Sequence, residues 1–204
     1  MDRARRKLGK NLAEEHPVDA DIVISVPDSS NTAALGYAGR TNIKFEIGLI
    51  RNHYVGRTFI HPEQKGRDFN VRVKFNAIEG VLKDRRVVIV DDSIVRGTTL
   101  KQLAKMVKRA GAREVHVRVS SPPIISPCFY GMDFPTEEEL IAFNKSTEEI
   151  RQYLGVDSLG YLSLEGMVNA ISTKEKGFCT ACFTGEYPLV SNEKPEKLQN
   201  ETTK

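Results

Sequence analysis

Two stretches of consecutive apolar residues in this chain each end at a polar loop and lead into a helical pattern. One is Val-Val-Ile-Val at 87–90, and the other is Ile-Val-Ile at 22–24, within a strand predicted over 21–26. Neither alternates with polar residues, so each predicts a strand buried on both faces, as in a parallel sheet. The pattern places helices after them over 33–38 and over 100–110, the second closed by Gly111 as its C-cap.

The rest of the chain continues this alternation of strands and helices. We predict helices over 2–15, 136–143, 146–154 and 165–171, strands over 44–50, 114–119 and 158–162, and either a helix or a short strand over 71–82. This order predicts an α/β domain over residues 1–189, with a central, mostly parallel sheet flanked by helices. A cysteine-bearing part over 120–189 forms a small appendage, and the polar residues 190–204 are predicted to be a disordered tail.

Residues 51–74 differ in character from the strands and helices around them. The segment holds six basic residues against two acidic ones, together with Gly56, Pro62 and Gly66. A long polar segment with hinge-capable residues is typical of a mobile lid, and the alternative is a solvated charged loop. Composition alone favours neither, and the polar loops after the two buried strands favour a flexible flap, because a mobile basic flap can close over an anionic group bound at those loops and exclude water.

Composition narrows the class of protein. With 204 residues, of which 40% are hydrophobic and 28% charged, the chain has the composition of a globular domain with a sizeable core. The net charge of +3 is too small to indicate nucleic acid, and no apolar run approaches the length of a membrane span. The amino terminus lacks the hydrophobic region of a signal peptide. We therefore expect a cytoplasmic protein with neither nucleic acid nor membrane as a partner.

The loop after the 87–90 run combines paired carboxylates with groups that bind anions. Asp91 and Asp92 end the strand, and Ser93 and the Gly-Thr-Thr at 97–99 lead into the helix, with Thr98 or Thr99 as its predicted N-cap. Helix-start N–H groups, hydroxyls and a glycine together make an anion cradle. The carboxylates can accept hydrogen bonds from ribose hydroxyls or hold Mg²⁺. The alternative is an ordinary capped helix in which the acids only cap.

A second polar loop, residues 27–32, leads from the other buried strand into its helix. Loops that follow neighbouring parallel strands build ligand crevices at the carboxyl ends of a sheet. Simple helix capping is the alternative function of this loop, and a ligand with two phosphate-bearing ends would require both loops.

The order of a hydrophobic run, two acids, a short loop and Gly-Thr-Thr resembles the phosphoribosyl pyrophosphate (PRPP) signature of type I phosphoribosyltransferases. Other stretches are similar to one family among these, the glutamine PRPP amidotransferases or amidophosphoribosyltransferases, which begin purine nucleotide synthesis. The matching stretches are Val26-Pro27-Asp28-Ser29, residues 54–60, residues 90–99, Ser121-Pro122-Pro123 with residues 128–131, and residues 179–185. Together they cover nearly the whole chain, which looks like the C-terminal phosphoribosyltransferase domain without the family's N-terminal glutaminase domain.

This resemblance implies roles for particular residues. It places Mg²⁺ at Ser29, Asp91 and Asp92, and it makes Arg57, in a flap that orders on PRPP binding, the group that stabilises charge on the leaving diphosphate. Catalytic roles are therefore predicted for Arg57, Asp91 and Asp92. The predicted ligand-binding residues, with the diphosphate at 27–30 and the 5′-phosphate at 94–99, are Pro27, Asp28, Ser29, Ser30, Ser93, Ile94, Val95, Arg96, Gly97, Thr98 and Thr99.

The three cysteines, Cys128, Cys179 and Cys182, are an odd number and suit a metal site or thiols better than a disulfide framework. A Cys-x-x-Cys pair with a distant third cysteine fits a metal site, and buried thiols are the alternative. By resemblance they are three ligands of a four-iron, four-sulfur cluster whose fourth cysteine lies upstream of this chain. We expect no complete cluster without that ligand.

The activity implied is the Mg²⁺-dependent conversion of PRPP and ammonia into 5-phosphoribosylamine and diphosphate, without glutaminase activity. Purine nucleotides as feedback ligands, a separate glutaminase and further copies in a homo-oligomer are the implied partners. Two other functions stay open. One is a non-catalytic PRPP-binding regulatory module, and the other is a salvage enzyme that joins PRPP to a base.

Overall fold

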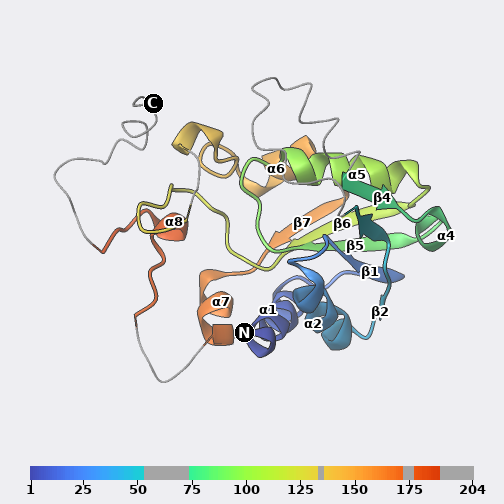
Figure 1. Cartoon of the computed structure of the whole chain (residues 1–204), viewed down its shortest axis with the longest axis horizontal. Helices are drawn as coiled ribbons and strands as arrows, with labels where there is room; N and C mark the ends of the chain where they lie inside the picture. Colours follow the sequence, from blue (N-terminus) through green and yellow to red (C-terminus); the bar gives the residue numbers. More distant parts are fainter. Residues whose placement is uncertain (53–73, 133–135, 172–176, 189–204) are drawn as a thin grey trace.

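The computed structural model describes residues 1–52, 74–132, 136–171 and 177–188, and a parallel sheet lies at its centre (Figure 1). The sheet has the order β2-β1-β5-β6-β7. These strands are β1 (Ile22–Ser25), β2 (Lys44–Phe45), β5 (Arg86–Asp91), β6 (Glu114–Val119) and β7 (Ser158–Tyr161). The predicted α/β class with a parallel central sheet is confirmed. No helix within these described ranges is long and apolar enough to cross a membrane.

Strand β5 lies in the middle of the sheet and is buried on both faces, as its unbroken apolar run predicts. Val87 and Ile89 pack in one core cluster with α5 (Thr98–Arg109) and α6 (Thr147–Leu154). Val88 and Val90 pack in a second cluster with α1 (Asp2–Glu15) and α2 (Asn31–Thr41). Figure 1 shows these two helical layers on opposite faces of the sheet, with α7 (Leu164–Ile171) beside α1.

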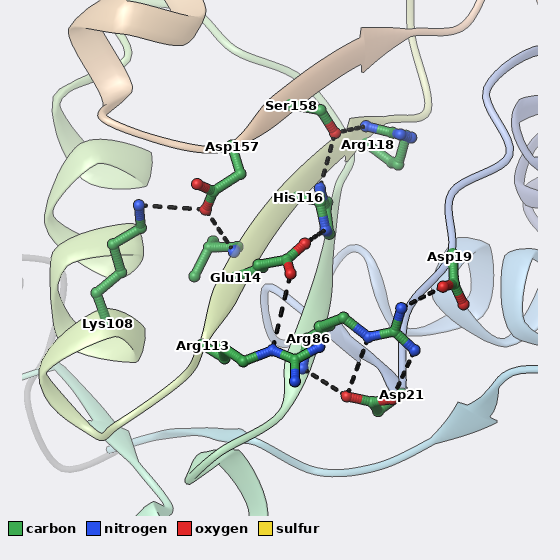
Figure 2. Close-up of polar contacts among 11 residues, drawn as sticks. Asp19, Asp21, Arg86, Lys108, Arg113, Glu114, His116, Arg118, Asp157 and Ser158 are labelled. Atoms are coloured by element: carbon green, nitrogen blue, oxygen red, sulfur yellow. Dashed lines mark hydrogen bonds and ion pairs between the residues drawn. The ribbon is translucent and has the colours of Figure 1, made fainter.

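Charged groups tie together the amino ends of the strands, at the edge of the sheet opposite the polar loops (Figure 2). Arg86 pairs with Asp19 and with Asp21, and the hydrogen bonds from Arg86 lower the pKa of Asp21 to about 2. Asp157 accepts the backbone N–H of Val115 at 2.8 Å and lies 3.2 Å from Lys108 Nζ. This network fixes the start of β5 and β6.

The predicted strand over 44–50 is wrong as a single element. Strand β2 ends at Phe45, and β3 (Leu49–Arg51) pairs antiparallel with β4 (Phe75–Ala77) in a separate two-stranded sheet. The break comes at Gly48, where an added Cβ would lie 2.7 Å from Ile24 Cγ2. The backbone therefore passes directly over the core there. The predicted segment 71–82 contains both β4 and a short helix, α4 (Glu79–Leu82), and residues 71–73 lie outside the described ranges.

The predicted helix over 136–143 is also wrong. Only the 3₁₀ turn η1 (Glu137–Glu139) forms, and Leu140, Ile141 and Ala142 follow it as three consecutive buried residues. Leu140, the residue after the turn, has the extended backbone angles φ −78° and ψ 114°, so the helical path ends there. The other predicted helices and strands are present, and one further short helix, α8 (Ala181–Thr184), occurs in the cysteine-bearing part. The predicted tail, residues 190–204, and nearly all of the predicted flap lie outside the described ranges.

Candidate active site at the carboxyl ends of two central strands

The loops after β1 and β5 lie at the carboxyl ends of neighbouring strands, and the helices that follow these loops pack on opposite faces of the sheet. The two strands are neighbours, but α2 follows β1 onto one face and α5 follows β5 onto the other. Such a switch opens a crevice at the carboxyl ends of the strands. A cavity of about 300 Å³ lies there. Its walls are Val26, Ser29, Asp91, Asp92, Ser93, Ile94, Val95, Arg96, Gly97, Thr98, Thr99 and Leu100.

A larger cavity of about 550 Å³ lies between the carboxyl ends of α1 and α2. Its charged wall residues already form ion pairs, Arg40 with Glu14 at 2.7 Å and Asp19 with Arg86. We assign the candidate site to the smaller cavity, because that one gathers the paired carboxylates and an anion-binding helix start.

Asp91 is the buried carboxylate of the site, with an exposed fraction of 8%. Its Oδ1 accepts hydrogen bonds from Ser30 Oγ at 3.1 Å and from the backbone N–H of Asp92 at 2.8 Å. Burial, and then the negative charge of Asp92, raise the pKa of Asp91 to about 7. A buried carboxyl group whose ionised form is disfavoured in this way is suited to bind a ligand that brings positive charge or hydrogen-bond donors.

The loop after β1 is fixed from both of its ends. Ser25 Oγ donates to Asn31 Oδ1 at 2.6 Å, and Asp28 Oδ2 lies 3.5 Å from Arg51 Nη1. Ser30 is the N-cap of α2, but its hydroxyl makes no capping bond and donates to Asp91 instead. Simple helix capping, the alternative for this loop, therefore does not describe Ser30. Of the four predicted residues 27–30, Ser29 lines the cavity and Ser30 supports Asp91.

The loop after β5 opens α5 with a glycine. Gly97 has a φ of +72° and is the N-cap, so the predicted capping by Thr98 or Thr99 is wrong. The physical reason is the left-handed turn, which glycine adopts without steric cost and which makes the two threonines the first helical residues. First-turn N–H groups have no acceptor within their own helix. Their position at the cavity, with the threonine hydroxyls, forms the predicted anion cradle.

The donors around the cavity fit Mg²⁺. Ser29, Asp91 and Asp92 all line it and supply one hydroxyl and two carboxylates. Mg²⁺ typically takes one or two protein carboxylates and completes its shell with water and ligand oxygens, so it does not need a dedicated cage. Within the described ranges, no three His, Cys, Asp or Glu side chains are arranged to hold a metal ion by themselves.

The cysteines lie in two segments that contact each other. The backbone N–H groups of Ile125 and Ser126 donate to Cys182 O at 2.9 and 3.1 Å. Cys128 and Cys182 are half-buried and Cys179 is exposed. Burial, and then the nearby Cys128 thiol, raise the pKa of Cys182. Within the described ranges, the three thiols are not arranged together as ligands of a metal ion.

The structure brings together every predicted signature residue from Asp91 to Thr99, and Arg57 lies outside the described ranges, so its role stays a prediction. Sequence reasoning missed two groups. Ser120 Oγ donates to the backbone oxygen of Asp91 at 3.2 Å, and its place directly after β6 was an available signal. Glu139 accepts two bonds from Arg96, 43 positions away, and no local pattern pointed to it.

Comparison with known proteins gives a consistent result. A family model, the phosphoribosyl transferase domain, matches residues 10–121. Amidophosphoribosyltransferase of Bacillus subtilis is 57% identical over 189 residues, which are 91% of this chain and 40% of that protein. The same-named protein of Methanocaldococcus jannaschii is 55% identical over 190 residues, 93% of this chain and 40% of its own length.

A solved structure agrees with these sequence matches. Glutamine PRPP amidotransferase from B. subtilis, in complex with ADP and GMP, superposes with a TM-score of 0.83 at 55% identity. The match covers 92% of this chain and 42% of that one. The chain thus spans about two fifths of the length of these relatives.

Proposed function

The chain belongs to the phosphoribosyl transferase family, and from that membership we propose that it converts PRPP and ammonia into 5-phosphoribosylamine and diphosphate. One observation carries the proposal. Asp91 and Asp92 face the same cavity as the glycine-started helix α5, so groups that bind ribose or metal lie beside groups that bind phosphate. The amidophosphoribosyltransferases to which the chain is similar are named for this type of transfer.

The two phosphate-bearing ends of PRPP are assigned to two different segments at the cavity. The segment 94–99 takes the 5′-phosphate, because the start of α5 offers backbone N–H groups and the hydroxyls of Thr98 and Thr99. The diphosphate lies toward the 27–30 loop, where Ser29 lines the cavity. The carboxylates of Asp91 and Asp92 line the same cavity and accept hydrogen bonds from the ribose hydroxyls.

Ser29, Asp91 and Asp92 would hold Mg²⁺, which when bound neutralises negative charge on the leaving diphosphate. The residues themselves position the ribose and keep it aligned with the nucleophile. In the transfer, the bond from the anomeric carbon to the diphosphate oxygen breaks and a bond to the ammonia nitrogen forms. The electron pair leaves with diphosphate, and the nitrogen loses one proton to solvent. Arg57 is proposed to add cationic stabilisation to the leaving group.

We propose that residues 1–204 use ammonia directly as the nitrogen donor, and that a glutaminase supplies it. Glutamine hydrolysis requires an activated nucleophile such as a thiolate. The raised pKa of Cys182 keeps that thiol protonated, which argues against a hydrolytic role for it. A complex of the B. subtilis relative contains ADP and GMP. GMP carries a ribose 5′-phosphate as PRPP does, so we propose purine nucleotides as competing ligands of the same cavity.

The proposal is tested with purified chain, PRPP, Mg²⁺ and an ammonium salt at mildly alkaline pH, by following diphosphate release. We expect release that requires all three components. Asp92→Asn is the matched variant, since it changes one exposed carboxylate at the cavity and should abolish the signal. PRPP binding in wild type without release would reject the enzyme and support a regulatory PRPP-binding module.

A further inference from the structure

We propose that Glu139 is a resident counter-ion of Arg96 that sets the affinity of the cavity for phosphate groups. The inference rests on the proposed function, because it assigns the 5′-phosphate to the loop that contains Arg96. It adds a residue from outside the signature, which reaches the site from η1. Glu139 weakens the binding of phosphate-bearing ligands and so speeds their release.

Two parallel hydrogen bonds join the side chains. Arg96 Nε donates to Glu139 Oε1 at 3.0 Å, and Arg96 Nη2 donates to Glu139 Oε2 at 3.0 Å. Arg96 is at the same time a wall of the cavity. A guanidinium edge that holds a carboxylate in this manner has the geometry that also binds a phosphate. The carboxylate therefore holds donors that a phosphate would use.

The backbone keeps Glu139 at this place. Ile141 N–H donates to Val95 O at 2.9 Å, next to Arg96 in the chain. Ile141 also lies over the next residue of the loop, since a Cβ on Gly97 would be 2.8 Å from Ile141 Cδ1. Leu140 is buried, with an exposed fraction of 2%. The segment after Glu139 is thus anchored in the core, and this anchoring holds the Glu139 carboxylate beside Arg96.

A phosphate that enters the cavity must either take over donors from Glu139 or bind beside its negative charge. Both cost binding free energy. The two side chains are each a little under half exposed, at 45% and 42%, so the ion pair is partly screened by solvent. Exposed ion pairs of this kind change an equilibrium by about two- to fivefold. We expect Glu139→Gln, which keeps the size and removes the charge, to tighten phosphate-group binding by about that factor.

The test uses calorimetric titration of the full chain with PRPP and, separately, with inorganic phosphate in competition with PRPP. Glu138→Gln is the matched control, since it removes a neighbouring exposed carboxylate whose hydrogen bonds, to Thr136 and to its own backbone N–H, stay within the turn. Glu139→Gln should lower the dissociation constants of both ligands about two- to fivefold, and Glu138→Gln should leave them unchanged. The gain should shrink as salt rises, because screening weakens the removed ion pair.

A double-mutant cycle separates this account from general effects of the substitution. In an Arg96→Ala background, Glu139→Gln should no longer change either dissociation constant. Unchanged or weaker binding in the single Glu139→Gln variant would overturn the proposal, and weaker binding would identify Glu139 as a residue that holds Arg96 in its binding orientation. Failure of the proposed function has a different signature, namely no diphosphate release by wild type, and the phosphate titrations still report on Glu139 in that case.

Discussion

Asp91→Asn should make the ligand-free protein more stable while it removes the activity. The pKa of Asp91 is raised from 3.8 to about 7, mainly by burial. A pKa that differs by one unit between the folded and unfolded states corresponds to about 1.36 kcal/mol. Ionised Asp91 therefore lowers the stability of the folded state by up to about 4 kcal/mol. An Asn at this position cannot ionise, and its amide oxygen still accepts from Ser30 Oγ and from the N–H of Asp92.

The sign of the pH dependence follows from the raised pKa. Between about pH 4 and pH 7 the folded protein holds a proton on Asp91 that the unfolded chain has released. The contribution of Asp91 to stability is therefore fully present below about pH 4 and is lost as the pH rises through about 7. The variant should gain about 1–4 kcal/mol over wild type at pH 8, and the gap should narrow toward pH 5.

Urea unfolding in the presence of EDTA, at a series of pH values, measures this difference without bound metal ions. Asp92→Asn is the control, and it should gain less, because the charge of Asp92 is a smaller cause of the raised pKa than burial. Both variants should lose PRPP turnover by about 10- to 150-fold for each charge-assisted hydrogen bond that is lost, since each such bond is worth about 1.5–3 kcal/mol. An Asp91→Asn variant that is less stable than wild type at pH 8 would refute the account of this carboxyl group.

Other predictions address the helices, the flap and the nitrogen donor. Gly9→Ala should destabilise the fold by about 2 kcal/mol or more in denaturant unfolding, because its Cβ would lie 1.9 Å from Ala33 O where α1 crosses α2. Gly39→Ala, a helical glycine with nothing within 4 Å, should instead gain about 0.5–1 kcal/mol. Arg57→Ala should lower kcat more than PRPP affinity in steady-state kinetics, and a pure binding defect would count against its role on the leaving group. At fixed total ammonium, the rate should rise about tenfold per pH unit while ammonium dominates, and equal rates with glutamine would contradict direct use of ammonia.

The central strands and the signature loop were predictable because their signals are local. The unbroken apolar run at 87–90 indicates burial on both faces, and the acids and the Gly-Thr-Thr come directly after it in the sequence. The break between β2 and β3 has a different origin. Gly48 packs against Ile24 and Leu82, which lie far from it in the chain. The apolar pattern contains no sign of these contacts and therefore predicted one strand.

The hydrogen bonds and ion pairs of the site could not be predicted either, because they join residues that lie far apart in the sequence. The bond from Ser30 to Asp91 joins residues 61 positions apart, and the pair of Arg96 and Glu139 joins residues 43 positions apart. The residue types alone do not say which carboxyl of the Asp91–Asp92 pair is buried. The fold decides it, because Asp91 is the last residue of β5 and Asp92 already belongs to the exposed loop.

The most direct measurement of the central claim follows the bond that the reaction makes. Wild-type chain is incubated with PRPP, Mg²⁺ and ¹⁵N-labelled ammonium, and ³¹P and ¹⁵N NMR spectra are recorded over time. The account predicts that diphosphate and a ribose 5-phosphate with nitrogen bonded to its anomeric carbon appear at equal initial rates. Diphosphate together with ribose 5-phosphate that carries no ¹⁵N, at every ammonium concentration, would show hydrolysis rather than transfer and would contradict it.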